Sequence, residues 1–146
     1  MTKTMQDTFQ SLRFAPFPVV AAPFGFVLGG GYEICGSCDR IVASAESYIG
    51  LVEVGMGIIP GAGGNLRMLS NVSDNIKTMM PGSFPIVQKV FETVGFAKVA
   101  TSAKEAKNFS YLRHKYNNYN LLNPQHQIHI LSFYNYEYRC QYNFRY

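Results

Sequence analysis

The chain has 146 residues, of which 47% are hydrophobic, and it carries a formal net charge of +4. A chain of this length buries roughly two thirds of its surface on folding, which suits one hydrophobic core and excludes two independent domains. Apolar runs stay well short of the roughly 18 residues of a membrane-spanning helix, and the N-terminus lacks the apolar stretch of a secretory signal, so we expect a cytoplasmic protein. Three cysteines in this setting predict reduced thiols rather than disulfides.

Apolar periodicity, with glycine and proline as breakers, predicts alternating helices and strands. In chain order we expect a helix over 5–14, a buried strand over 18–28, a short helix over 32–38, a strand over 39–44, a strand and loop over 47–64, and helices over 63–71, 85–97 and 102–108. Ser102 starts the last helix, and Glu105 three residues later completes a capping box. The alternation predicts an α/β layered fold.

Three consecutive glycines precede Glu33 in the segment LGGGYE. Their spacing fits neither the dinucleotide fingerprint nor the P-loop, which leaves a strand that turns through glycines into a helix. The first N–H groups of such a helix have no carbonyl partner, and without side chains an acceptor oxygen can approach them closely. Because Glu33 lies three residues after Gly30, the free N–H and the carboxylate share one helix face. This pattern favours either an oxyanion donor beside a catalytic carboxylate or tight packing of the helix against a sheet.

Two further motifs were weighed as metal sites. Cys35 and Cys38 form a single Cys-x-x-Cys pair, which is half of a zinc site, and on a helix both thiols are more typical of packing residues. His126 and His129 have the spacing of two ligands but no third. We therefore predict no metal in this chain.

Residues 108–146 differ in composition from residues 1–107. They hold eight of the ten Tyr, all three His and seven Asn, but none of the thirteen Gly, and four Lys/Arg against one Asp/Glu. A/T-rich codons read out of frame give this composition, and so does a basic, aromatic strand that binds single-stranded nucleic acid. We interpret 108–146 as a non-native-looking, poorly ordered tail and favour the frame change over a nucleic-acid partner.

Residues 18–69, PVVAAPFGFVLGGGYEICGSCDRIVASAESYIGLVEVGMGIIPGAGGNLRML, resemble the signature segment of the crotonase (enoyl-CoA hydratase/isomerase) superfamily. The match includes Pro-Val-x-Ala-Ala, Leu-Gly-Gly-Gly-x-Glu, Cys-Asp, Ala-Ser and Gly-Ile-Ile-Pro-Gly-Ala-Gly-Gly in order. The variants APFG and YIGLVEVG, with SAKEAK downstream, are most similar to the hydratase module of bacterial multifunctional fatty-oxidation proteins, where it is fused to a 3-hydroxyacyl-CoA dehydrogenase. The resemblance implies a partial crotonase-like ββα spiral core over residues 1–107.

The resemblance also implies roles for individual residues. The N–H of Gly30 would be half of an oxyanion hole, and Glu33 and Glu53 would be the two carboxylates that add water to a 2-enoyl-CoA. We assign the water to Glu33 and the proton at C2 to Glu53. The glycines expected at the substrate pocket are Gly29, Gly31, Gly61 and Gly63, and for Gly61, Gly63 and Gly64 a purely structural turn is an equally good explanation. The implied substrate is an acyl-CoA thioester, the intact family forms homo-oligomers, and no NAD site or other cofactor is expected.

The second oxyanion donor and much of the CoA pocket lie, in the family, on a strand and loop upstream of the part that this chain resembles. The family's closing C-terminal helices would follow residue 107. We therefore expect a fragment of a fatty-acid β-oxidation enzyme that is inactive alone and exposes apolar core surface. The alternatives are a small active enoyl-CoA hydratase and an interaction protein that acts through residues 108–146.

Overall fold

The computed structural model describes residues 2–76, 84–113 and 129–131. In chain order its elements are α1 (Thr2–Arg13), β1 (Val19–Ala21), β2 (Phe26–Leu28), α2 (Gly30–Ser37), β3 (Arg40–Ile41), β4 (Tyr48–Gly50), the 3-10 helix η1 (Glu53–Met56), α3 (Gly64–Ile76), α4 (Phe84–Val90), the π-helix η2 (Phe91–Gly95), β5 (Val99–Ala100), α5 (Ala103–Asn108) and β6 (His129–Leu131). Helices and strands are interspersed along this order, which confirms the predicted α/β class.

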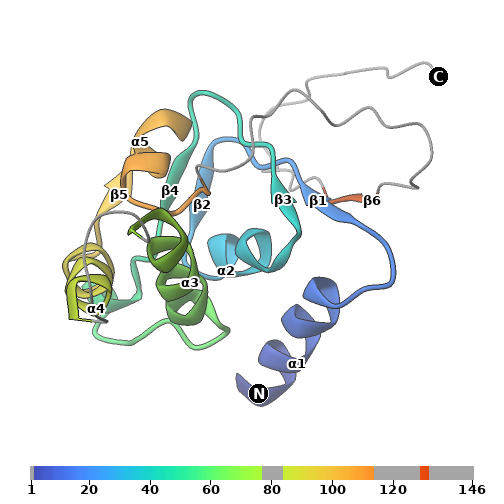
Figure 1. Cartoon of the computed structure of the whole chain (residues 1–146), viewed down its shortest axis with the longest axis horizontal. Helices are drawn as coiled ribbons and strands as arrows, with labels where there is room; N and C mark the ends of the chain where they lie inside the picture. Colours follow the sequence, from blue (N-terminus) through green and yellow to red (C-terminus); the bar gives the residue numbers. More distant parts are fainter. Residues whose placement is uncertain (1, 77–83, 114–128, 132–146) are drawn as a thin grey trace.

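Within the described residues, the strands form two small sheets of three strands each (Figure 1). In the first sheet β1 lies between β3 and β6 and is parallel to both. In the second sheet β4 lies between β2, which is parallel to it, and β5, which is antiparallel. Helix α2 connects β2 to β3 and packs against α1 and α3, while α3 also contacts α4. The first turn of α2 therefore follows directly from a strand of the second sheet.

The single strand predicted over residues 18–28 is wrong, because the chain divides there into β1 and β2, which belong to different sheets. Pro23 has no N–H with which to continue a ladder, and Gly25 has a φ of 63°, a region that side-chain-bearing residues rarely adopt. The break directs β2 toward β4 and so places the glycine triplet beside the end of β4.

One apolar core cluster joins the two sheets to α2, α3, η2 and α5. Its most buried members are Ala21, Tyr32, Cys35, Ile49, Leu51, Met68, Val72, Ala100, Ala106 and Tyr111. Cys35 and Cys38 are only 1% and 3% exposed, which confirms that they are packing residues. Burial raises the pKa of the Cys35 thiol to about 12, so this thiol remains protonated at neutral pH.

The predicted N-cap of α5 is confirmed, since the Ser102 hydroxyl accepts a hydrogen bond from the N–H of Glu105 at 3.2 Å, whereas the Glu105 carboxylate reaches back to the N–H of Thr101 at 2.7 Å. The folded part continues past the predicted boundary at residue 107, because α5 ends at Asn108 and Tyr111 is fully buried. His126 and most of the expected tail lie outside the described residues. The frame change and the nucleic-acid partner therefore stay predictions.

Several large apolar side chains of the described residues are exposed, as expected for this chain. The most exposed are Phe14, Phe26, Met56, Ile58, Ile59, Phe84, Phe91 and Phe96. Within the same part of the chain, no helix has both the length and the apolar character that crossing a membrane would require.

Candidate active site

The glycine triplet forms a tight turn from β2 into α2. Gly29 has a φ of 54°, and its N–H donates to the carbonyl of Gly50 at the end of β4 at 2.9 Å. Gly30 is the first residue of α2, so its N–H has no carbonyl one turn earlier in the helix. A Cβ atom placed on Gly30 or Gly31 would meet no atom within 4 Å. An acceptor oxygen therefore has open access to the N-terminal end of α2, which favours negative charge.

Glu33 lies in the first turn of α2 and is only 3% exposed. Its Oε1 accepts hydrogen bonds from the N–H of Ala62 at 2.9 Å and from the N–H of Gly64 at 2.8 Å. Both donors belong to residues 61–64, Gly-Ala-Gly-Gly, which lead into α3 and are called the second glycine cluster below. Bonds from N–H groups to a carboxylate are among the stronger hydrogen bonds in proteins, so they fix the orientation of this side chain.

A glycine is needed at position 64 because its backbone lies against the side chains of Leu51 and Glu33. A Cβ on Gly64 would lie 2.7 Å from Leu51 Cδ2 and 3.0 Å from Glu33 Oε1. These distances are shorter than van der Waals contact, so only glycine lets the loop approach Glu33 this closely. This glycine was predicted as part of the motif, but its direct contact with Glu33 was not.

Glu53 lies at the start of η1, three residues after β4 ends at Gly50. Its Oε1 would be 3.2 Å from a Cβ atom at Gly29, so the carboxyl group rests against the glycine turn. Its Oε2 is buried and has no hydrogen-bond partner among the described residues. Burial raises the pKa of Glu53, and the negative charge of Glu33 raises it further. The charge of Glu33 therefore favours the protonated form of Glu53.

Neutralising Glu53 should stabilise the fold at neutral and higher pH. The folded-state pKa of Glu53 lies above its ordinary value of 4.5. The contribution of Glu53 to the free energy of unfolding is therefore fully present below pH 4.5 and is lost as the pH rises through the folded-state pKa. Glu53→Gln should therefore raise the Tm at about pH 8 and change it little at about pH 4. Thermal unfolding followed by circular dichroism at both pH values measures this, with the exposed Glu46→Gln as control. A Tm gain of equal size at both pH values would contradict a partly buried Glu53 carboxyl group that ionises in the folded chain.

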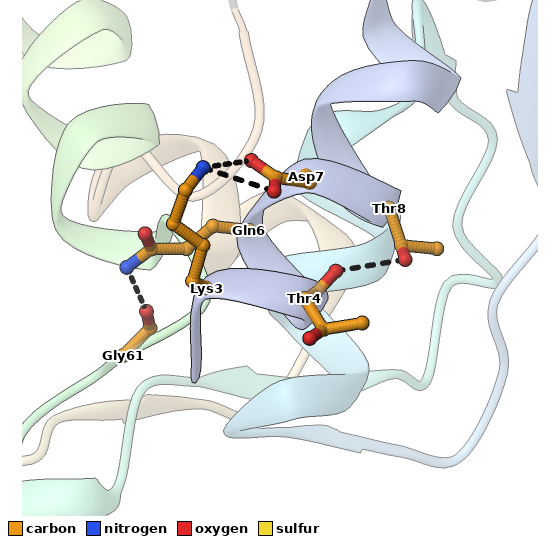
Figure 2. Close-up of polar contacts among 6 residues, drawn as sticks. All are labelled: Lys3, Thr4, Gln6, Asp7, Thr8 and Gly61. Carbon is orange, nitrogen blue, oxygen red and sulfur yellow. Dashed lines mark hydrogen bonds and ion pairs between the residues drawn. The ribbon is translucent and has the colours of Figure 1, made fainter. Parts of the chain in front are cut away.

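The second glycine cluster is also contacted by α1, as Figure 2 shows. The Gln6 side chain donates to the carbonyl of Gly61 at 2.7 Å, on a helix whose exposed surface carries the Lys3–Asp7 ion pair. Gly63 has a φ of 114°, and its carbonyl accepts the N–H of Arg67 in α3. Gly61 and Gly63 thus have clear structural roles, and their expected place at a substrate pocket stays a prediction.

A cavity of about 200 Å³ lies elsewhere, between the C-terminal end of α2, β3 and α5. Its lining includes Cys38, Arg40, Ala43, Lys104, Lys107 and Arg113. Neither Gly30 nor either glutamate contributes to it, so it is separate from the glycine turn. Within the described residues, no group of three His, Cys, Asp or Glu side chains has an arrangement that could hold a metal ion.

The structure brings together the N-terminal end of α2 at Gly30, the buried Glu33 and the Glu53 carboxyl group. A free N–H donor beside two carboxyl groups suits proton transfer next to a developing oxyanion. Sequence reasoning missed the two N–H groups that hold Glu33, because their position depends on the packing of α3 against α2. The three glycines within residues 61–64 were the available signal of that close approach.

Comparison with known proteins gives consistent results. The enoyl-CoA hydratase/isomerase family matches residues 1–80. A probable 3-hydroxyacyl-CoA dehydrogenase of Bacillus subtilis is 42% identical over 113 residues, which is 76% of this chain and 14% of that protein. A fatty acid oxidation complex subunit alpha of Acinetobacter baylyi is 44% identical over 64 residues, which is 44% of this chain and 9% of the relative. The crystal structure of an enoyl-CoA hydratase from Bacillus anthracis matches with a TM-score of 0.59 and 28% identity, over 76% of this chain and 38% of that one. The chain thus spans less than half the length of each of these proteins.

Proposed function

The chain belongs to the enoyl-CoA hydratase/isomerase family, and from this premise we propose that Gly30, Glu33 and Glu53 add water to 2-enoyl-CoA thioesters of fatty-acid oxidation. The observation that carries the proposal is that three groups lie at one turn of the chain. Gly30 is the first residue of α2, and Glu33 lies one helical turn later, where two N–H groups hold its carboxylate. Glu53 lies against Gly29, the residue before Gly30.

The N–H of Gly30 would bind the thioester carbonyl oxygen. This hydrogen bond draws electron density from the conjugated double bond and makes C3 electrophilic. As the oxygen of water bonds to C3, the π electrons move onto the carbonyl oxygen, and the same N–H stabilises the resulting enolate. The positive end of the α2 dipole acts in the same direction.

The two glutamates then divide the proton transfers. Glu33, whose Oε1 is oriented by two N–H donors, takes the proton from the attacking water. Glu53, whose raised pKa keeps it protonated to higher pH than an ordinary carboxyl group, gives its proton to C2. The net result is addition of H and OH across the double bond, with one proton moved from Glu53 to C2 and one gained by Glu33.

In the family that this chain resembles, the residue at Gly30 supplies one of two oxyanion donors, and one such donor is worth about 100-fold to 1000-fold in turnover. The short share of the relatives that the chain covers supports a role as part of a larger acyl-CoA enzyme. Dehydrogenase activity is not part of the proposal, and the cytoplasmic location and homo-oligomeric state stay predictions from the sequence.

Replacing Gly30 by proline tests the oxyanion role directly. Proline is favoured at the first position of a helix, and no atom lies within 4 Å of a Cβ there, so α2 should form as before. The substitution replaces the amide hydrogen by a ring carbon, so position 30 can no longer donate to the thioester oxygen, and hydration of a short enoyl-CoA should fall by about 100-fold or more. The Tm reports whether the fold is kept, and Glu46→Gln, at an exposed position outside the site, serves as the control. Unchanged hydration by a folded Gly30→Pro variant would rule out the Gly30 N–H as the donor.

A further inference from the structure

Tyr111 lies beyond α5, in the part of the chain whose composition differs from the rest. It is fully buried, and both its hydroxyl and its backbone carbonyl have partners in other elements. Two of these partners are Tyr32, which directly precedes Glu33, and Leu51, which lies two residues before Glu53. Tyr111 is therefore bonded to both segments that carry a glutamate, although it is distant from them in the sequence.

The hydroxyl of Tyr111 joins β4 to β5. It accepts a hydrogen bond from the N–H of Leu51 at 3.2 Å and donates one to the carbonyl of Lys98 at 2.8 Å. Leu51 directly follows β4 and stands two residues before Glu53. The hydroxyl thus fixes the point from which the chain leaves β4 to form η1.

The backbone carbonyl of Tyr111 is joined to α2. It accepts a hydrogen bond from the hydroxyl of Tyr32 at 3.0 Å, and the two aromatic rings pack edge to face with centroids 5.0 Å apart. Tyr32 is itself fully buried and directly precedes Glu33 in α2. One residue therefore contacts both of the elements that carry a glutamate.

A polar network from α3 holds the backbone of Tyr111 in place. The amide nitrogen of Asn71 donates to the carbonyls of Ser110 and Tyr111 at 3.0 and 3.2 Å. The amide oxygen of Asn71 accepts a hydrogen bond from Arg113 at 3.1 Å. Buried networks in which the members are paired are rigid, so Tyr111 is a fixed reference point.

We propose that Tyr111 is a positioning residue that sets the separation of Glu33 and Glu53 by tying α2 to the end of β4. A positioning role for Tyr111 rests on the proposed function, because it concerns the two glutamates of the hydration reaction. Its test does not require turnover of a substrate. Among the described residues, the ionisable group that raises the pKa of Glu53 is Glu33 from α2. Burial and the charge of Glu53 raise the pKa of the Tyr111 hydroxyl.

The test is the titration of Glu53 in the folded chain, followed by NMR of carboxyl-labelled glutamate, in the wild type, Tyr111→Phe and Tyr48→Phe. Loss of the Tyr111 hydroxyl frees Leu51, so the Glu53 carboxyl group gains water and moves away from Glu33. Its titration midpoint should then fall toward the ordinary value, while exchange of the Leu51 amide accelerates by about tenfold or more. Tyr48→Phe, a substitution at a half-exposed tyrosine of β4, should change neither.

A folded Tyr111→Phe variant that is less stable but titrates at Glu53 like the wild type would overturn the proposal, because a merely structural role moves only stability. If Tyr111→Phe does not fold, amide exchange in the wild-type chain tests the proposal instead. The Leu51 amide must then exchange among the slowest in the chain, and exchange as fast as that of the exposed Gly55 would also overturn the proposal. Failure of the hydratase proposal would appear separately, as an absence of turnover with the Glu53 midpoint still shifted by Tyr111→Phe.

Discussion

Replacing Glu33 by alanine should lower the free energy of unfolding by about 3 kcal/mol, whereas Glu33→Gln should change it by no more than about 1 kcal/mol. Alanine leaves the buried N–H groups of Ala62 and Gly64 without an acceptor and opens a space beside Leu51. Glutamine keeps an oxygen in the place of Oε1 and loses only the charge. The difference between the two variants isolates the role of that one oxygen.

Urea unfolding followed by circular dichroism measures this difference. Glu46→Ala, at an exposed position, is the control for removing a glutamate without a buried partner. Equal losses in Glu33→Ala and Glu33→Gln would mean that the charge, not the hydrogen-bonded oxygen, holds the second glycine cluster. That result would remove the structural explanation for the buried position of Glu33.

Gly64→Ala should destabilise the chain by about 2 kcal/mol, because it overpacks a filled site. The added methyl group would meet Leu51 at 2.7 Å and Glu33 at 3.0 Å, so the carboxyl group must move away from the Ala62 N–H. We expect faster exchange of the Ala62 amide together with the loss of stability. Both effects come from one contact and should appear together.

Gly31→Ala is the matched control, with an expected effect of opposite sign. No atom lies within 4 Å of a Cβ at Gly31, and alanine in a helix is favoured over glycine by about 1 kcal/mol. Chemical unfolding of both variants, with amide exchange of Ala62, gives the comparison. A Gly64→Ala variant as stable as Gly31→Ala would show that α3 does not pack against Glu33 as described.

Sequence reasoning predicted the geometry of the first turn of α2 because that geometry is local. A strand, three glycines and a glutamate three residues after Gly30 are enough to place a free N–H and a carboxylate one turn apart. The burial of Cys35 and Cys38 and the capping of α5 by Ser102 followed from equally local patterns. For the helix start and the Ser102 cap, the partners lie within a few residues of each other along the chain.

The rest depends on contacts between distant segments. The division of residues 18–28 into two strands became clear only from the pairing of β2 with β4. The N–H groups that hold Glu33 come from residues 29 and 31 positions away in the sequence. Tyr111 was placed in an anomalous tail because composition describes a whole segment, whereas burial is decided residue by residue. A buried tyrosine hydroxyl with two backbone partners leaves no pattern in the sequence.

The central claim is that Glu33 takes part in hydrating an enoyl-CoA thioester, and Glu33→Gln is the right variant because we expect it to fold. The measurement is the loss of absorbance of a short 2-enoyl-CoA in the presence of the wild-type chain, Glu33→Gln and Tyr48→Phe. We expect slow hydration above the buffer rate by the wild type and by Tyr48→Phe, and a rate at least about 100-fold lower for Glu33→Gln. Equal rates for the wild type and Glu33→Gln would contradict the account.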